Sequence, residues 1–133
     1  MRIFELTAKN WGCRKINFVD DNNVFVGYEY EDQCCEQFGF YITNEEPKEV
    51  DFSLNETIHG LHYRHNFDTE YCKHIEGENR EDTITTGVVF KLTKSGVEDA
   101  FLVLYNSHEG HYHHGFKFGT VGCGDEFMQE GEI

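Results

Sequence analysis

Histidine is the residue type in this sequence best suited to support chemistry. The 133-residue chain has eight histidines, four between residues 59 and 74 and four between residues 108 and 114. If the second group extends a strand, His111 and His113 share one face, with their Cα atoms about 6.6 Å apart. Neutral imidazoles at this spacing are suitable ligands for Zn²⁺ and related ions.

A zinc site built on this pair needs further ligands. The candidates are His108, the adjacent Cys34 and Cys35, or a histidine of the first group. The chain has neither an H-E-x-x-H motif nor a C-x-x-C pair, so no zinc signature supports the site. Two interpretations therefore stay open. Either the histidines form a Zn-like site, with or without hydrolytic activity, or they lie on a solvated face and no cofactor is bound.

The five cysteines argue against a disulfide framework, because their number is odd and no secretory signal precedes them. Buried free thiols are the expectation. A nucleophile made of Cys34 or Cys35 with a histidine has no local signature. No apolar run approaches the roughly 20 residues that cross a bilayer. We therefore expect a cytoplasmic protein with no membrane partner.

Acidic residues dominate the charge of the chain, with 25 acids, 11 bases and a net charge of −14. This balance weighs against direct binding to nucleic acid and favours a protein partner with a basic surface. The acids fall in three clusters: Glu29, Glu31, Asp32 and Glu36; Glu45, Glu46, Glu49 and Asp51; Glu76, Glu78, Glu81 and Asp82. Such clusters can imitate the phosphate spacing of a nucleic acid, or simply form a solvated face.

A third possibility is a small-molecule binder such as a nucleotide sponge. It needs a cationic or aromatic pocket, for which the candidates are Tyr63, Arg64, Arg80 and Tyr112. The chain has no G-x-G-x-x-G or Walker-type loop to hold phosphates.

A period of two in the apolar residues predicts that most of the chain is antiparallel sheet. The clearest unit is Val88–Phe118, which we expect to form three strands joined by turns at Gly96 and Gly110. An N-terminal hairpin is predicted around the turn at residues 20–23, with Val24, Val26, Tyr28 and Tyr30 on one face. Shorter strands are expected at residues 2–6 and 38–42.

Two short helices complete the expected fold. Ser53 and Glu56 fit a capping box that would begin a helix through His59. Asp68 would cap a second helix at residues 69–75. The chain is thus predicted to be one α+β domain, residues 1–133, dominated by antiparallel sheet, with a loose tail after about residue 127.

Two motifs resemble a known family. Glu31–Phe38 contains an Asp-x-Cys-Cys segment, and Leu104–Phe116 fits Asn-x-x-x-Gly-x-Tyr-x-x-Gly-Phe. Together they resemble a small domain family without an assigned function, found in phages and their bacterial hosts. His111 departs from the pattern, since the family more often has Tyr there. The resemblance implies a compact β-rich domain of phage or mobile-element origin, and it supplies no catalytic residues.

Small acidic proteins of such origin often act by binding and blocking a host complex. The expectation is therefore an acidic, non-enzymatic binding protein, an inhibitor of a host defence or nucleic-acid-handling complex. The oligomeric state does not follow from the sequence.

Overall fold

Alternating apolar residues make almost every described element a strand. The computed structural model describes residues 1–7, 14–30, 36–54, 64–79, 82–110, 112–122 and 128–133. The strands in these ranges are β1 Arg2–Thr7, β2 Arg14–Val19, β3 Val24–Glu29, β4 Gln37–Thr43, β5 Asn66–Glu76, β6 Ile84–Lys94, β7 Val97–His108, β8 Gly115–Thr120 and β9 Met128–Glu132. They are accompanied by one 3₁₀ turn, η1, at Phe52–Leu54.

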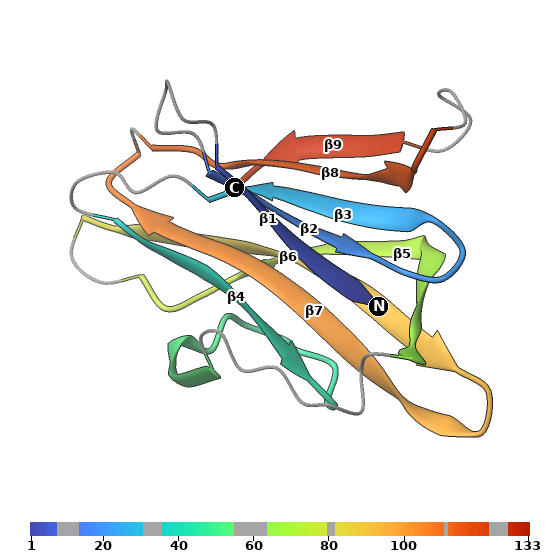
Figure 1. The fold of residues 1–133 in the computed structure, drawn as a ribbon. Coiled ribbons are helices and arrows are strands. Elements are labelled where there is room, and N and C mark those ends of the chain that lie inside the picture. The colour runs from blue at the N-terminus through green and yellow to red at the C-terminus, as the bar shows by residue number, and fades with distance from the viewer. Residues whose placement is uncertain (8–13, 31–35, 55–63, 80–81, 111, 123–127) are drawn as a thin grey trace.

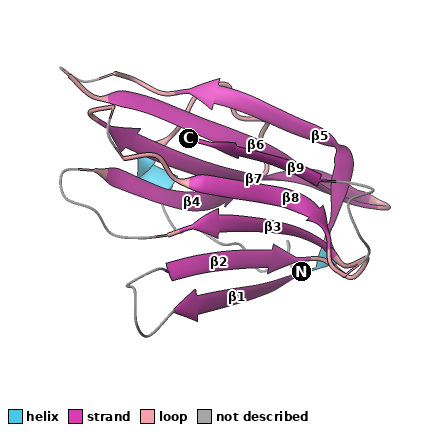
Figure 2. Ribbon diagram, turned by 90° about the horizontal axis from the view of Figure 1, so that it is seen from above, coloured by secondary structure: helices cyan, strands magenta, loops and turns pink. Residues whose placement is uncertain are grey.

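The strands form two antiparallel sheets that lie face to face (Figure 1). One sheet has five strands in the order β1-β2-β3-β8-β9, and the other has four in the order β4-β7-β6-β5. Figure 2 shows this order from above. In the smaller sheet β5, β6 and β7 follow one another as hairpins, and β4 lies beside β7, which is a Greek-key arrangement.

The main core lies between the two sheets. In β3 every second side chain points inward, so Val24, Val26 and Tyr28 are buried as the alternation predicts. Aromatic rings join the layers, with ring centroids 5.1 Å apart for Phe18 and Phe40. Such edge-to-face pairs add to the stabilisation from apolar burial.

A second, smaller core covers the outer face of the four-stranded sheet. Tyr41, Val89 and Val103 point away from the main core and pack with Val50, beside the half-buried Phe52 of η1. This sheet is therefore buried on both faces, which explains the near-continuous apolar run of β7.

The fold is mainly β rather than α+β, and the predicted second helix is wrong. Residues 69–75 belong to β5, which has a register shift between Phe67 and Cys72. The shift interrupts the period of two, and Asp68 Oδ1 accepts a hydrogen bond from the Glu70 N–H at 3.0 Å. An Asp side chain that accepts from a nearby backbone N–H occurs both in turns and at helix N-caps, which is why Asp68 favoured the wrong helix prediction. No helix among the described residues is long and apolar enough to cross a bilayer.

The first predicted helix reduces to η1 within the described residues, and residues 55–59 lie outside them. The β6–β7 hairpin is confirmed, with Gly96 at a φ of 75°. The predicted third strand of this unit does form, as β8, but it does not pair with β7. It lies in the other sheet, between β3 and β9.

The end of the chain differs from the predicted loose tail. Met128–Glu132 form β9 and pair with β8, and Ile133 is buried. The backbone of Ile133 exchanges two hydrogen bonds with that of His114, at 2.8 and 3.0 Å.

A buried aspartate ties the two sheets together at the turn before β3. Asp20 Oδ1 accepts hydrogen bonds from the N–H groups of Asn22 and Val24, and Asp20 Oδ2 accepts one from Phe67 at the start of β5, each at 2.9 Å. The predicted turn is confirmed, with Asn23 at a φ of 60°.

Candidate functional site

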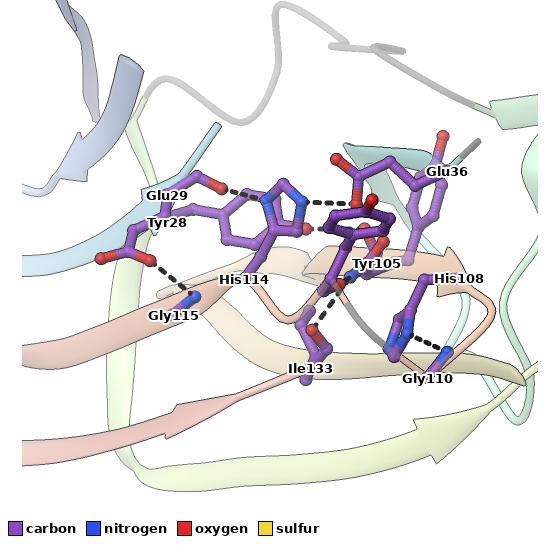
Figure 3. Close-up of polar contacts among 11 residues, drawn as sticks. Tyr28, Glu29, Glu36, Tyr105, His108, Gly110, His114, Gly115 and Ile133 are labelled. Atoms are coloured by element: carbon purple, nitrogen blue, oxygen red, sulfur yellow. Dashed lines mark hydrogen bonds and ion pairs between the residues drawn. The ribbon is translucent and has the colours of Figure 1, made fainter. Parts of the chain in front are cut away.

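A buried histidine–glutamate pair lies at the C-terminal end of β3, whereas Asp20 lies before the start of that strand. Figure 3 shows His114 and Glu36 with their polar contacts. His114 Nε2 lies 2.8 Å from Glu36 Oε2, and the two side chains are 2% and 0% exposed. His114 Nδ1 lies 2.6 Å from the backbone oxygen of Glu29. The imidazole also stacks on Phe38, with ring centroids 4.6 Å apart.

These contacts determine where the protons of the pair lie. A carbonyl oxygen only accepts hydrogen bonds, so Nδ1 of His114 carries a proton. The remaining proton lies between Nε2 and the Glu36 carboxylate. The pair is therefore either an imidazolium with a carboxylate or two neutral groups, and in both cases the hydrogen bond is made.

Around this pair, further polar groups connect the sheets. Tyr28 donates from its hydroxyl to the backbone oxygen of Tyr105 at 2.7 Å. Burial, followed by the nearby charge of Glu36, raises the pKa of Tyr28 well above its ordinary value. Asn106 donates to the backbone oxygens of Tyr112 and Ile133, at 2.6 and 3.1 Å. These contacts link β3, β7 and the last residue of the chain.

A cleft of about 910 Å³ opens beside this cluster. Its lining includes His74, Thr86, His108, His113, Glu132 and Ile133. The rings of His108 and His113 meet edge to face, with centroids 4.7 Å apart. Thr86 Oγ1 is buried and has no hydrogen-bond partner among the described residues.

The local contacts limit how His108 binds a metal. Its Nδ1 accepts a hydrogen bond from the Gly110 N–H at 2.8 Å, so the proton of the neutral ring lies on Nε2. A protonated nitrogen does not ligate a metal. Within the described ranges, no three side chains of His, Cys, Asp or Glu come together to hold an ion. Three predicted ligands lie outside those ranges: Cys34, Cys35 and His111.

The predicted placement of His111 and His113 on one strand face lies partly outside the described residues, because His111 is not among them. Residues 112–114 are described and are not in a strand. His113 is exposed at the cleft, whereas His114 turns inward to Glu36.

The structure brings the second and third acidic clusters together. Glu49 and Glu76 form an isolated parallel β-bridge, in which the Val50 N–H donates to the backbone oxygen of Glu76 at 3.1 Å. The exposed acids on both sides of this bridge are Glu45, Glu46, Glu49, Asp51, Glu76 and Glu78, which we call the acidic surface.

A groove of about 840 Å³ runs along part of the acidic surface. Its walls include Tyr41, Phe52 and Leu54 beside five of the six carboxylates. Within this groove, Glu46 accepts a hydrogen bond from the Tyr71 hydroxyl and lies 3.9 Å from Lys73 Nζ. An aromatic and apolar groove lined by carboxylates suits the long side chain of a Lys or Arg.

The first acidic cluster does not join this surface. Glu36 is wrong as a surface residue, because it is buried against His114. Glu29 is exposed on the outer face of the five-stranded sheet, where it accepts from the Gly115 N–H at 3.1 Å. Asp82 is exposed, and Glu31, Asp32 and Glu81 lie outside the described residues.

The residues predicted for a nucleotide pocket are only partly described. Arg64 is exposed, Tyr112 is half-buried, and Tyr63 and Arg80 lie outside the described ranges. Neither Arg64 nor Tyr112 lines the cleft or the acidic groove.

No protein-family model, curated protein or solved structure matches this chain. The resemblance to the phage and bacterial domain family therefore stays a prediction from the two motifs.

Proposed function

We propose that this chain is a non-enzymatic binding protein that recognises a basic surface on a protein partner. The acidic surface, Glu45 to Asp51 with Glu76 and Glu78, makes the contact. The observation that carries the proposal is the bridge between Glu49 and Glu76, because it joins two acidic segments far apart in the sequence.

Charge supports this proposal at two scales. The net charge of −14 favours encounter with cationic surfaces and slows approach to nucleic acid or anionic lipid. Locally, Lys48 is the one base among the described residues that line the groove. Lysine and arginine side chains of a partner would find an anionic groove with an apolar wall there.

The biological setting is also a proposal, and it rests on the motif resemblance. A protein of phage or mobile-element origin with this surface would inhibit a host defence or nucleic-acid-handling complex. It would occupy the basic groove that normally holds nucleic acid. The carboxylates would stand in for phosphates.

The test is affinity capture from a bacterial host lysate treated with nuclease, followed by mass spectrometry. The wild-type protein should retain a basic protein at about 0.1 M NaCl and lose it at about 1 M, because the Debye length falls from about 10 to about 3 Å. Retention that is independent of salt would contradict a charge-based contact.

A matched pair of variants locates the contact. Glu45→Gln, Glu49→Gln and Glu78→Gln together remove three exposed carboxylates of the acidic surface. The control, Glu98→Gln with Asp99→Asn, removes two exposed carboxylates at the start of β7. The triple variant should lose the captured protein and the control should keep it. Equal loss in both would assign binding to overall charge instead.

The histidine-lined cleft favours a second candidate, a metal-binding protein. The close approach of the His108 and His113 rings is the observation behind it. Metal binding at Nε2 of His108 would require its proton to move to Nδ1 and the hydrogen bond from the Gly110 N–H to break. Metal analysis of untagged protein tests it: one equivalent of zinc per chain would support the site, and a substoichiometric trace would exclude it.

A further inference from the structure

Strand β1 leaves one backbone edge of the five-stranded sheet unpaired among the described residues. We propose that this edge pairs with β1 of a second copy of the chain. The two five-stranded sheets then continue into each other across a twofold axis, and the protein is a dimer with two acidic surfaces.

The four sheet edges differ in how they are protected. β5 has a register shift and a run of charged side chains, and both features discourage strand addition. β9 is short and carries Glu130, Gly131 and Glu132. β4 has four consecutive buried residues, Gly39–Ile42. β1 has no bulge, proline or lysine, and all but one of its six residues are exposed.

Apolar side chains mark the same strand. Phe4 is 44% and Leu6 is 55% exposed, and both are large hydrophobic residues. They lie on the same face, since Phe4 pairs with Asn17 and Leu6 with Lys15 of β2. Figure 2 shows β1 at the outer border of its sheet. An exposed, apolar edge strand of this kind is a template for another strand.

The local charge permits a second copy to approach, although the whole chain is strongly acidic. β1 and β2 together contain three bases and one acid. That acid, Glu5, accepts a hydrogen bond from Arg14 Nε at 3.1 Å. Arg2 lies over the Phe4 ring, 5.8 Å from its centroid. The edge is therefore free of the unpaired carboxylates that would repel a second copy elsewhere.

The sequence of β1 is self-complementary in an antiparallel register centred on Phe4. Phe4 then faces Phe4 of the second copy, Arg2 faces Leu6, and Ile3 faces Glu5. Neither arginine nor glutamate faces its own counterpart. Arg2 also lies diagonal to the second Phe4 ring, where a cation–π contact is favourable.

Sedimentation equilibrium of the full chain from about 1 to 300 µM tests the proposal, a range that spans ordinary dimer affinities. The wild type should be dimeric at the upper concentrations. Phe4→Lys places two ammonium groups on the twofold axis and should raise the dimer Kd by about tenfold or more. The matched control is Val97→Lys in the β6–β7 hairpin, where Val97 is also 44% exposed, and it should leave the Kd unchanged.

Three outcomes of this comparison would overturn the proposal, and a fourth comes from the salt dependence. The first three are a monomer at every concentration, equal Kd values for the wild type and Phe4→Lys, and equal weakening by Val97→Lys. Leu6→Lys is the second variant if Phe4→Lys does not fold. Raising NaCl to about 0.5 M should leave the dimer intact, because screening reduces the repulsion between two acidic chains. Dissociation by salt would show that charged side chains, and not the edge of β1, hold the dimer together.

Discussion

The two ends of the sandwich are joined by different chemistry. At the aspartate end, before β3, the single carboxylate of Asp20 accepts three backbone N–H groups. At the histidine end, beyond β3, the side chain of His114 meets the side chain of Glu36. β3 therefore runs between two buried acids, one satisfied by backbone and the other by a titratable partner.

The two ends therefore differ in how a buried acid is satisfied. At the aspartate end, three backbone N–H groups that belong to the fold itself hold the carboxylate. At the histidine end, a second side chain meets the carboxylate, beside a tyrosine whose pKa is raised by burial. The adjacent cleft is lined by Thr86, whose hydroxyl has no hydrogen-bond partner among the described residues, so a ligand entering the cleft would contact the histidine end.

The largest expected effect comes from Glu36→Ala. It leaves the buried His114 imidazole without its partner, which should lower the free energy of unfolding by about 3–5 kcal/mol. Chemical denaturation at pH 7 measures the loss. The control is Glu130→Ala on β9, which removes an exposed carboxylate and should cost no more than about 0.5 kcal/mol.

A double variant tests whether the unpaired imidazole causes this loss of stability. Glu36→Leu with His114→Phe replaces the pair by apolar groups and keeps a ring against Phe38. It should be more stable than Glu36→Ala, because no buried imidazole nitrogen is left without a partner, although the backbone oxygen of Glu29 loses its donor. If Glu36→Ala costs less than about 1 kcal/mol, water reaches His114 and the pair is not closed.

The second effect is Asp20→Ala at the other end. It removes the acceptor of three backbone N–H groups and should cost about 2–3 kcal/mol, measured in the same denaturation experiment. The cost is smaller than for Glu36→Ala because Asn22 lies in an exposed turn where water can replace the lost acceptor. Asp20→Asn keeps an oxygen acceptor and should cost less than Asp20→Ala. Equal costs would show that the negative charge, not hydrogen bonding, stabilises this end.

The sequence predicts strands well where one face alone is buried. The alternation in β3 places its buried residues correctly, and Gly96 identifies the β6–β7 hairpin. It fails at β5, because a register shift breaks the period and Asp68 imitates a cap. It also misassigns the partner of β8, since alternation reports which face of a strand is buried and not which strand lies beside it.

The candidate sites were predictable to a lesser degree. Charge alone identifies the two segments of the acidic surface, but their meeting depends on the bridge between Glu49 and Glu76. The His114–Glu36 pair joins residues 78 positions apart, and no local pattern indicates it. A buried acid needs a partner, and that partner is distant in the sequence, so acidic composition alone could not distinguish the buried Glu36 from an exposed acid such as Glu29.

A third, smaller effect tests the pH response of the histidine end. Tyr28→Phe removes the hydrogen bond to the Tyr105 oxygen and should cost about 1 kcal/mol at neutral pH. In the folded wild type, the raised pKa keeps the Tyr28 hydroxyl protonated above pH 10.0, whereas the same hydroxyl in the unfolded chain loses its proton there. The stability from this group is therefore lost as pH rises above 10.0.

The measurement is the free energy of unfolding of both proteins between pH 9 and pH 12, a range around the ordinary pKa of about 10 for tyrosine. The free energy of unfolding should fall less steeply with rising pH in Tyr28→Phe than in the wild type. Parallel declines would assign the alkaline sensitivity to other tyrosines, such as Tyr71, whose pKa is raised to about 12.

The smallest effect concerns two neighbouring threonines of β6 that face opposite ways. Thr85 Oγ1 donates to the Glu78 backbone oxygen or to Ser107 Oγ, at 3.2 and 3.0 Å, so Thr85→Val should cost about 1 kcal/mol. Thr86 Oγ1 has no partner among the described residues, so Thr86→Val should be neutral or slightly stabilising. Thermal unfolding of both variants gives the comparison. If Thr86→Val costs as much as Thr85→Val, a water molecule or ligand in the cleft satisfies that hydroxyl, and the histidine end is occupied in solution.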